Sequence, residues 1–402
     1  MIYLDNAATT FPKPDCVTAE MNKCIREYCG NPGRSGHVLS LRASEKIYEC
    51  RQTLAAFFGS DKPENVVFTL NTTYALNLAI KSLYTPGAHM LISNMEHNSV
   101  YRPVWELQAR GEATYDTFNV LQPTDRILAE LHAKVTPKTK MLVMLHASNL
   151  CGKVFPIREI GSFCRKHGIL FIVDAAQSAG IIEIDMKRCS IDALCAPSHK
   201  GLYGPQGLGF VIFGDTQPVR TVIEGGNGIN SLSAAMDGEL PERFEGGTMP
   251  TPAIAALDAS VRFIRDVGVR KINAHETALA AELCRLLSRI PGSILRGTRL
   301  PETGIVLYEN ANVSVNRIAE GLNARDICTR GGFHCCPLGH AALRTGKKAR
   351  SASAWAITTP SAISTRLPMP SAKSAKNRKR LPGSLPRAVF ALKNPVCLQW
   401  RG

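Results

Sequence analysis

Short apolar runs alternate with amphipathic stretches between about residues 60 and 215. Such runs, bounded by turn residues, are typical of buried β-strands. We expect strands at 65–69, 89–93, 140–145, 169–173, 193–196 and 209–213. Residues 157–167, between two of these runs, carry apolar side chains at helical spacing. Near-continuously apolar strands separated by helices predict an open, doubly wound α/β layer with a mostly parallel sheet.

The pattern changes after Pro250 and Pro252, which interrupt the chain before long helical stretches. Residues 293–340 mix strand and helix patterns and predict a smaller α+β unit, whereas regular patterning ends after 348. The expected division is a large domain at 14–250, a small domain from 1–13 and 251–348, and a tail at 349–402.

Composition narrows the class of protein. The chain has 402 residues, of which 45% are hydrophobic and 20% charged, as is usual for a globular protein of two domains. No apolar run approaches the ~20 residues of a membrane span. The first residues lack the basic region and apolar core of a secretory signal. We therefore expect a cytoplasmic protein. Its 13 cysteines show no regular spacing, so we expect neither a disulfide framework nor a bound metal.

The net charge of +15 comes mostly from the tail. Ten of the 48 Lys and Arg residues lie in 349–402, which has no Asp or Glu, so the rest carries 38 basic and 33 acidic residues. A basic, disordered tail that binds nucleic acid is one interpretation. The body of the chain gives no support to nucleic-acid binding.

Polar side chains gather directly after the predicted strands, where ligands bind in open α/β sheets. Asp174 ends one apolar strand, and Lys200 lies in a glycine-rich stretch after the next. Taken singly, Asp174 could be a cap and Lys200 a surface lysine or phosphate contact. Together they suit an aldehyde cofactor, which needs a lysine amine for a covalent bond and a carboxylate that keeps a pyridine nitrogen protonated.

Thr72 and Thr73 stand where a predicted strand gives way to a helix at 74–82. Helix N-termini bind phosphate, although both threonines could equally be helix caps. His97, in the polar cluster after another strand, could be a ligand or an ordinary buried histidine.

Three segments resemble the class V aminotransferase family, and within it the cysteine desulfurases. They are Leu4-Asp5-Asn6-Ala7-Ala8-Thr9-Thr10, Asp174-Ala175-Ala176-Gln177, and Ser198-His199-Lys200 with Gly204-Pro205-Gln206-Gly207. The resemblance covers about 1–348. It implies the pyridoxal-phosphate-dependent transferase fold of type I, a homodimer, and a role in sulfur supply for iron–sulfur cluster assembly.

The resemblance also implies how pyridoxal 5′-phosphate is bound. Lys200 bonds covalently to the cofactor, and Asp174 pairs with its pyridine nitrogen. Gln177 and Asn149 bind the ring oxygen, while His97 stacks on the ring and moves protons. The phosphate contacts are Thr72, Thr73, Ser198, His199 and, from a second subunit, Thr248. Many relatives have Gly-Ala-Thr-Glu at 71–74, so Thr72 departs from the family pattern and Thr73 does not.

Residues 329–337 resemble the Arg-x-Gly-x-His-Cys-x-Pro segment of desulfurases with a short catalytic loop. This implies that Cys335 takes sulfur from L-cysteine, leaving alanine, and passes it to an acceptor protein. Arg330 would hold the substrate carboxylate, a bidentate task that suits guanidinium, and Asn149 would assist. The alternatives are that Cys335 and Cys336 are both small buried side chains, or that the chain is another class V enzyme, such as a selenocysteine lyase or an aminotransferase.

The tail departs from the family. Relatives continue after the Cys335 loop with a strand and a helix that 349–402 lacks as written. Read one base out of frame, the codons of 351–359 are compatible with that strand, and those up to 373 with an amphipathic helix. We interpret 349–402 as frameshifted, disordered and not packed in the small domain, which would leave a sheet edge uncovered and impair activity.

Overall fold

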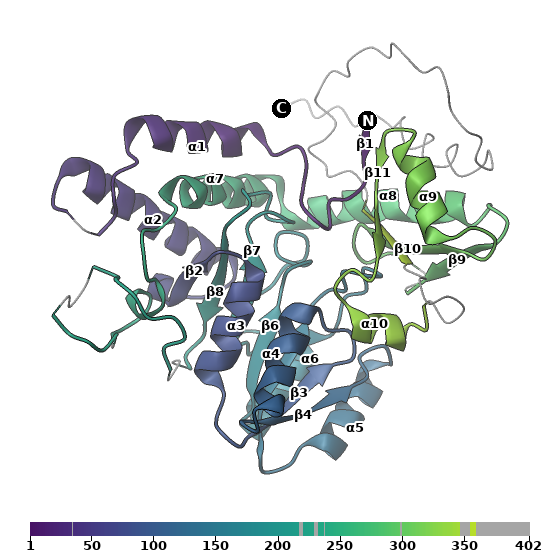
Figure 1. Cartoon of the computed structure of the whole chain (residues 1–402), viewed down its shortest axis with the longest axis horizontal. Coiled ribbons are helices and arrows are strands. Elements are labelled where there is room, and N and C mark those ends of the chain that lie inside the picture. Colours follow the sequence, from purple (N-terminus) through teal and green to yellow (C-terminus); the bar gives the residue numbers. More distant parts are fainter. Residues whose placement is uncertain are drawn as a thin grey trace.

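A mixed seven-stranded sheet forms the centre of the protein in the computed structural model (Figure 1). The structure describes residues 1–33, 35–216, 220–228, 232–236, 238–297, 300–345 and, for the backbone, 354–358. The strands are β2 (Val66–Thr69), β3 (His89–Ser93), β4 (Thr114–Phe118), β5 (Thr139–Leu145), β6 (Leu170–Asp174), β7 (Ala193–Pro197) and β8 (Gly209–Phe213). Their order is β2-β8-β7-β6-β5-β3-β4, and only β8 runs against the others.

Each strand predicted from an apolar run is present, with ends that differ by at most a residue or so. The sequence prediction missed β4, because Thr114–Phe118 alternates exposed polar positions with half-buried ones at the edge of the sheet. An edge strand is half solvated, so it lacks the continuous apolar run of a central parallel strand.

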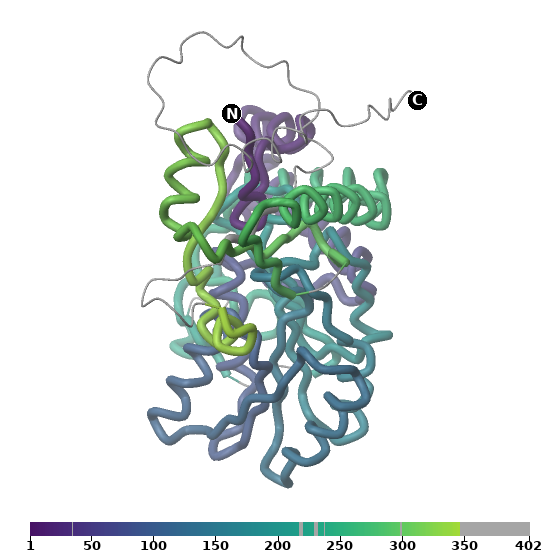
Figure 2. The backbone as a smooth tube through the Cα atoms, turned by 90° about the vertical axis from the view of Figure 1, so that its right-hand side faces the viewer, coloured from purple at the N-terminus to yellow at the C-terminus, as the bar shows by residue number. Residues whose placement is uncertain are grey.

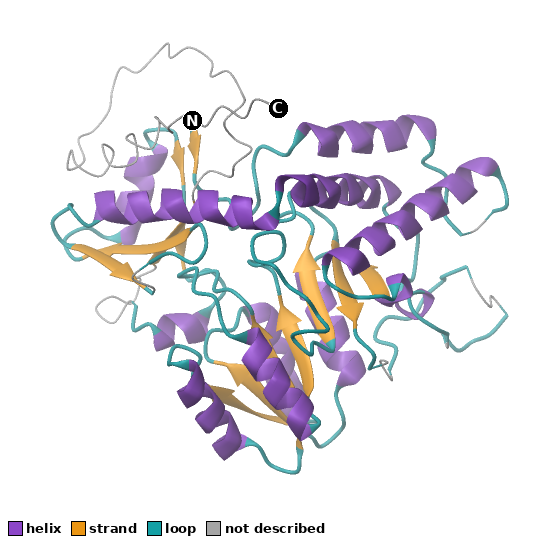
Figure 3. Cartoon of the chain, turned by 180° about the vertical axis from the view of Figure 1, so that it is seen from behind, coloured by secondary structure: helices purple, strands orange, loops and turns teal. Residues whose placement is uncertain are grey.

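Helices cover both faces of the sheet (Figure 3). Alternate residues of a strand face opposite sides, so Val67 packs with α3 (Thr72–Leu83) and α4 (Asn98–Ala109). Val66 and Phe68 pack on the other side. That side is covered by α2 (Val38–Phe57), α5 (Thr124–Lys134), α6 (Ile157–His167) and α7 (Thr251–Val267). Two short 3-10 turns, η1 (Pro63–Asn65) and η2 (Glu242–Phe244), complete this part.

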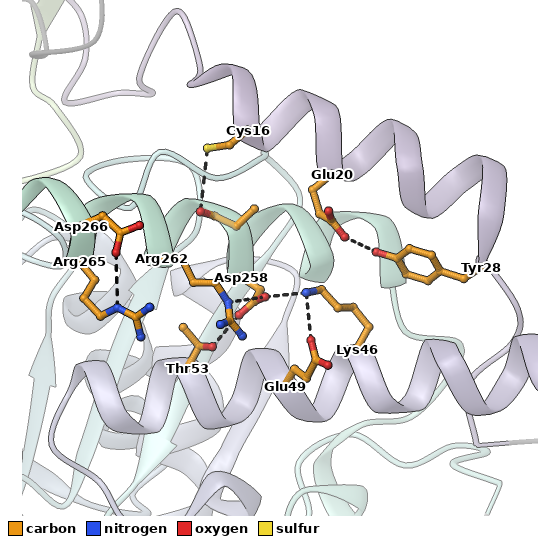
Figure 4. A network of polar contacts seen from close by, with 11 residues as sticks. Cys16, Glu20, Tyr28, Lys46, Glu49, Thr53, Asp258, Arg262, Arg265 and Asp266 are labelled. Carbon is orange, nitrogen blue, oxygen red and sulfur yellow. Dashed lines mark hydrogen bonds and ion pairs between the residues drawn. The ribbon is translucent and has the colours of Figure 1, made fainter. Parts of the chain in front are cut away.

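Helix α7 lies between α1 (Asp15–Glu27) and α2, and one buried carboxylate ties it to α2 (Figure 4). Asp258 of α7 is 1% exposed and accepts hydrogen bonds from Lys46 Nζ at 2.7 Å and Thr53 Oγ1 at 2.6 Å. Arg262, one turn further along α7, adds a third bond at 3.0 Å. Burial alone would raise the pKa of Asp258, but the bonds from Lys46 and Thr53 outweigh it and hold that pKa below its usual value.

A second buried ion pair lies on the free edge of β2. Arg51 of α2 donates to Glu245 through both terminal nitrogens, at 2.9 and 2.5 Å. The same two side chains also bind the strand, because Arg51 donates to the Val66 carbonyl and Glu245 accepts the Phe68 N–H at 2.7 Å. The pair therefore fixes the loop that carries Glu245 to the sheet.

The smaller part of the chain has its own sheets and core. Its elements are β1 (Ile2–Tyr3), α8 (Val269–Leu287), β9 (Ser293–Arg296), β10 (Ile305–Asn310), α9 (Val315–Asn323), β11 (Ile327–Cys328), β12 (Arg330–Gly332), α10 (Pro337–Ala342) and β13 (Ala354–Thr358). N-terminal β1 pairs in parallel with β11 (Figure 2), so Leu4 packs with Leu283 and Tyr308. The domain boundary at residue 250 stays a prediction.

Strand β13 corrects one expectation about the tail. The backbone of Ala354–Thr358 lies between β10 and β12 and pairs antiparallel with both. The expectations that no part of 349–402 packs in the small domain, and that a sheet edge stays uncovered there, are therefore wrong for these five residues. Ladder bonds join backbone groups, so an altered side-chain sequence can still pair. The other residues of the tail lie outside the described ones, and the frameshift interpretation stays a prediction.

Candidate active site

The predicted site residues converge at the carboxyl ends of β5, β6 and β7, around a cavity of about 270 Å³. Its lining is Asn71, Thr72, Thr73, His97, Ser99, Leu145, Ala147, Asn149, Asp174, Ala176, Gln177, His199 and Lys200. Eight of the ten residues expected to bind the cofactor, Lys200 included, line this cavity. The geometry of an open α/β sheet explains the convergence, because parallel strands end at one edge.

Asp174 and Lys200 face the cavity from the ends of neighbouring strands. Asp174 is 4% exposed and accepts the Ala176 N–H at 2.8 Å. Burial raises the pKa of Asp174, and burial lowers the pKa of Lys200. Each charge opposes the shift of the other. The site thus holds a carboxylate whose charged form is stabilised by a cationic partner, and an amine that loses its proton more easily than usual.

The start of α3 supplies backbone donors to the cavity. Asn71 caps this helix, since its side chain accepts the Tyr74 N–H at 3.2 Å. Thr72 and Thr73 are therefore the first helical residues rather than the cap, and the N–H groups of a first turn attract anions. The side chain of Thr73 also bonds Ser99 Oγ at 2.9 Å, which joins the first turns of α3 and α4.

His97 has a structural role as well as a place in the cavity lining. It caps α4, because Nδ1 accepts the Ser99 N–H at 3.1 Å. Burial, followed by the charges of Lys200 and Arg330, lowers the pKa of His97 to about 4. The imidazole is therefore neutral near pH 7, and a cap that fixes Nδ1 leaves the rest of the ring to face the cavity.

Asn149 and Gln177 line the cavity with amide groups that also bind backbone. Asn149 Nδ2 donates to the His334 carbonyl at 2.8 Å, and its Oδ1 is buried without a partner among the described residues. Gln177 Nε2 donates to the Ala7 carbonyl at 3.0 Å. Both side chains thus connect the cavity to a distant segment of the chain.

The N-terminal segment holds the backbone just before Lys200. The His199 carbonyl accepts hydrogen bonds from Thr10 N–H at 3.0 Å, Lys13 Nζ at 2.9 Å and Thr9 Oγ1 at 3.2 Å. Burial lowers the pKa of Lys13 to about 8. Donors from residues 9–13 therefore fix the lysine loop from the side of the small sheet.

The two adjacent cysteines lie in different surroundings. Cys335 is exposed, and its carbonyl accepts the Asn98 N–H at 2.7 Å, which places it beside the first turn of α4. Cys336 is 0% exposed and donates its thiol to the Met95 carbonyl at 3.2 Å. Burial raises the pKa of Cys336 to about 12. The interpretation as a small buried side chain thus applies to Cys336 and not to Cys335.

Arg330 and Cys335 act electrostatically on the cavity. The charge of Arg330 lowers the pKa values of Lys200, His97 and Asp5, and the charge of Cys335 raises that of Lys200. Neither residue lines the cavity itself. Backbone contacts nevertheless place Cys335 beside the lining, because its carbonyl accepts the N–H of Asn98, which stands between the lining residues His97 and Ser99.

Two expected phosphate ligands lie outside the cavity lining. Ser198 is 0% exposed, and its hydroxyl lies so close to Gly204 that an added Cβ there would stand 2.1 Å away. Thr248 is exposed in the loop after Glu245. Their contacts with a phosphate stay predictions.

Sequence reasoning missed several members of the site. The sequence analysis did not name Asn71 and Ser99, which line the cavity, or Lys13, which binds the His199 carbonyl. The signal that could have identified them is a polar residue within one or two positions of a strand end or of the first turn of a helix. Glu96 is also fully buried beside the site, and burial raises its pKa well above the usual range. The sequence analysis identified the polar cluster that contains Glu96 and His97, but it did not predict that Glu96 is buried.

The residues present fit pyridoxal phosphate. The buried carboxylate of Asp174 matches a pyridinium nitrogen, and Lys200 supplies an amine whose lowered pKa favours bonding to an aldehyde. Asn149 Oδ1 and His199 Nδ1 are buried polar atoms without partners among the described residues, and both belong to the lining. Buried polar atoms are rarely left unpaired, so a polar ligand accounts for them. In the described ranges, no group of three or more His, Cys, Asp or Glu is placed to hold a metal ion.

Comparison with known proteins agrees with this geometry. The family model described as "Aminotransferase class-V" matches residues 2–359. A probable cysteine desulfurase of Methanothermobacter thermautotrophicus is 32% identical over 349 residues, which is 83% of this chain and 84% of that protein. A probable cysteine desulfurase of Xylella fastidiosa (strain 9a5c) is also 32% identical, over 83% of this chain and 82% of its own length.

Solved structures show the same fold. The apo structure of a cysteine desulfurase from Thermococcus onnurineus NA1 superposes with a TM-score of 0.81 at 27% identity, covering 90% of each chain. The cysteine desulfurase CsdA from Escherichia coli superposes with a TM-score of 0.78 over 90% of each chain, and at 22% identity it speaks for the fold alone. The expected type I pyridoxal-phosphate transferase fold is confirmed. No described helix is both long and apolar enough to cross a membrane.

Proposed function

The chain belongs to the class V aminotransferase family, whose members typically use pyridoxal phosphate, and we propose that within it this chain is a cysteine desulfurase. The proposed reaction converts L-cysteine to L-alanine and leaves the sulfur on Cys335. The observation that carries the proposal is the exposed thiol of Cys335, whose backbone carbonyl accepts the N–H of Asn98, between the cavity-lining residues His97 and Ser99.

The residues of the cavity would hold the cofactor. Lys200 would bond to its aldehyde and Asp174 would face its pyridine nitrogen. The first turn of α3, with Thr72 and Thr73, would receive the phosphate. When bound, the cofactor supplies an electron sink that lets the substrate lose its Cα proton.

The chain's own groups would handle the protons and the substrate charge. Neutral His97, with a pKa of about 4, can accept a proton within the cavity. Lys200 can take up and return a proton at Nζ once its amine is free. Arg330, on β12, would bind the substrate carboxylate at the opening, since guanidinium binds carboxylates in two parallel hydrogen bonds.

Sulfur transfer needs no further reactant. The thiolate of Cys335 would attack the sulfur of the bound cysteine, so that an S–S bond forms as the Cβ–S bond breaks. Cβ gains hydrogen and becomes the methyl group of alanine, while the Cys335 thiol is oxidised to a persulfide. The atoms and electrons of L-cysteine and one enzyme thiol thus balance against alanine and the persulfide.

The proposed partners are L-cysteine, a sulfur-acceptor protein and a second copy of the chain. Thr248 supports the homodimer, because it is exposed and lies outside its own chain's cavity, as a contact with a partner's cofactor phosphate requires. The buried pair of Arg51 and Glu245 holds the segment that presents it.

Incubation of the cofactor-loaded protein with L-cysteine tests the proposal. We expect equimolar alanine and persulfide in a single turnover without reductant, with the extra sulfur found by mass spectrometry on the peptide that contains Cys335. Release of alanine from selenocysteine only, or transfer of an amino group to a keto acid without persulfide, would instead indicate a selenocysteine lyase or an aminotransferase.

A further inference from the structure

Cys335 lies in a tight turn that its own residue types do not favour. The Cys336 N–H donates to the Phe333 carbonyl at 2.9 Å, which closes a four-residue turn with His334 and Cys335 at its centre. Both central residues have positive φ, 51° at His334 and 55° at Cys335. Positive φ at both centres is the signature of a type I′ turn, which normally carries Asn or Gly there.

Such a turn persists only when its surroundings hold it. Two of the holding bonds come from the backbone of the turn, since the His334 carbonyl accepts Asn149 Nδ2 at 2.8 Å and the Cys335 carbonyl accepts the Asn98 N–H at 2.7 Å. Cys336 fixes the far side through its thiol bond to Met95. The exposed thiol of Cys335 is thus the only side chain of the turn's last three residues that is not buried.

The side chain of His334 joins the turn to both α10 and β12, whereas Phe333 of the same turn meets only the His340 ring, edge to face at 5.5 Å. Its ring is 6% exposed and stacks on His340 of α10, with centroids 5.8 Å apart and planes 14° apart. Nε2 lies 3.3 Å from the Arg330 carbonyl, so this nitrogen carries the proton and donates. Burial lowers the pKa of His334 to about 4, which keeps the ring neutral and leaves one donor nitrogen for that carbonyl.

We propose that His334 is a positioning residue, which holds the Cys335 turn between β12 and α10 and so aims the thiol at the cavity. The inference rests on the proposed function, in which Cys335 receives the sulfur. The ring joins the turn that carries the thiol to the backbone of Arg330, whose guanidinium would bind the substrate carboxylate. Asn149 joins the same turn to the cofactor cavity from the other side.

Two substitutions separate the ring's contacts from the backbone strain. Asn adopts positive φ more readily than most residues, but its short side chain cannot reach the Arg330 carbonyl. Gln places an amide nitrogen about where histidine has Nε2, but unlike Asn it does not adopt positive φ more readily than histidine does. The proposal therefore predicts that His334→Gln retains the function and that His334→Asn loses it. His340→Phe keeps a ring for stacking and His340→Ala removes it.

The test uses the cofactor-loaded full chain and two readouts. In single-turnover reactions with L-cysteine, we expect His334→Asn to lower the rate constant of persulfide formation about tenfold to a hundredfold, since misplacement by about 1 Å has effects of that size, with cofactor affinity within about twofold. We expect His334→Gln and His340→Phe to stay within about threefold of the wild type. In hydrogen exchange, the amides of Asn98 and Cys336 should exchange about tenfold faster in His334→Asn and His340→Ala, and at the wild-type rate in the other two variants.

An asparagine variant with the wild-type rate of persulfide formation and wild-type exchange would overturn the proposal. So would equal losses in the Asn and Gln variants accompanied by weaker cofactor binding, because that result indicates a general loss of structure. Hydrogen exchange needs no turnover. If the wild-type chain makes no alanine, the proposed function fails, whereas the exchange rates still decide whether His334 holds the turn.

Discussion

The thiols of Cys335 and Cys336 are adjacent in the chain but face opposite ways. Cys335 is exposed, whereas Cys336 is fully buried and donates to the Met95 carbonyl at 3.2 Å. Burial raises the pKa of Cys336 to about 12, so hardly any of it is thiolate near pH 7. Only one of the two thiols is thus available as a nucleophile.

This difference predicts unequal effects of substitution. Cys335→Ser should keep the absorbance of the bound cofactor and lose persulfide formation, since a hydroxyl cannot hold the sulfur. Cys336→Ser should keep persulfide formation within about threefold, at a stability cost of roughly 1 kcal/mol for a hydroxyl in a thiol's buried place. Mass spectrometry of the peptide after one turnover measures both. Equal losses of persulfide would show that Cys335 is not the sole acceptor.

Lys200 should be the covalent attachment point of the cofactor. Borohydride reduction of the loaded protein should fix the cofactor to the peptide that contains Lys200, and Lys200→Ala should abolish that adduct. Lys187→Ala is the matched control, because this lysine is exposed at the opposite end of the sheet. A reducible adduct that persists in Lys200→Ala would assign the bond to another amine.

Asp174→Asn should bind the cofactor and lose most of the activity. The neutral amide is nearly the same size but no longer favours a protonated pyridine nitrogen, so the electron sink weakens. Removing one electrostatic partner at a reacting centre typically costs about 10²- to 10³-fold in kcat. Asp116→Asn, on exposed β4, should leave kcat unchanged. A fall of less than threefold in Asp174→Asn would mean that the ring nitrogen does not depend on this carboxylate.

Asp258 should contribute stability that depends on pH. Its pKa is lower folded than unfolded, so the contribution is fully present above the unfolded value of about 3.9 and is lost as pH falls through the folded pKa. Asp258→Asn should lower the free energy of unfolding at pH 7 by about 2–3 kcal/mol, the size expected for hydrogen bonds to a charged group, and should weaken the loss of stability below pH 4.

Denaturant unfolding at several pH values measures this effect. Asp266→Asn is the matched control on the same helix, because Asp266 is exposed and its contact with Arg265 is 3.8 Å long (Figure 4). Surface pairs of this kind contribute little, so its unfolding curve should match the wild type within about 0.5 kcal/mol. Equal effects of the two substitutions would contradict the role of the buried network.

The frameshift interpretation has a direct test in the nucleotide sequence around codons 345–350. A chain with the frame restored from that point should make alanine faster than the present chain, because it would regain the strand and the helix that the resemblance to the family implies for the small domain. Equal rates for the two chains would show that residues after 348 do not affect the reaction.

The sequence predicted the structure best where burial alone decides which residues can form an element. Strands such as His89–Ser93 are buried on both faces, so an apolar run marks them almost to the residue. Asp174 and Lys200 were identifiable because a strand end and a glycine-rich loop fix where their side chains point. By contrast, the half-solvated β4 carries no such run.

Features that depend on contacts between distant segments could not be predicted in the same way. Nothing in Cys335-Cys336 says which thiol is buried, since that depends on Met95, more than two hundred residues earlier. The bonds from Thr10 and Lys13 to the His199 carbonyl also join remote segments. Strand β13 shows the converse, because backbone pairing with β10 and β12 does not require the side-chain pattern that sequence reasoning looks for.

The ion pair of Arg51 and Glu245 also protects the chain from self-association. By binding the Val66 carbonyl and the Phe68 N–H, the two side chains occupy the backbone groups that an added strand would use. An open sheet edge is a template for aggregation between copies, and covering or charging it is how natural proteins avoid that outcome. The opposite edge, β4, carries the exposed charge of Asp116 in its middle. One edge of the central sheet is thus covered and the other carries a charge, and both features disfavour the addition of a strand from another chain.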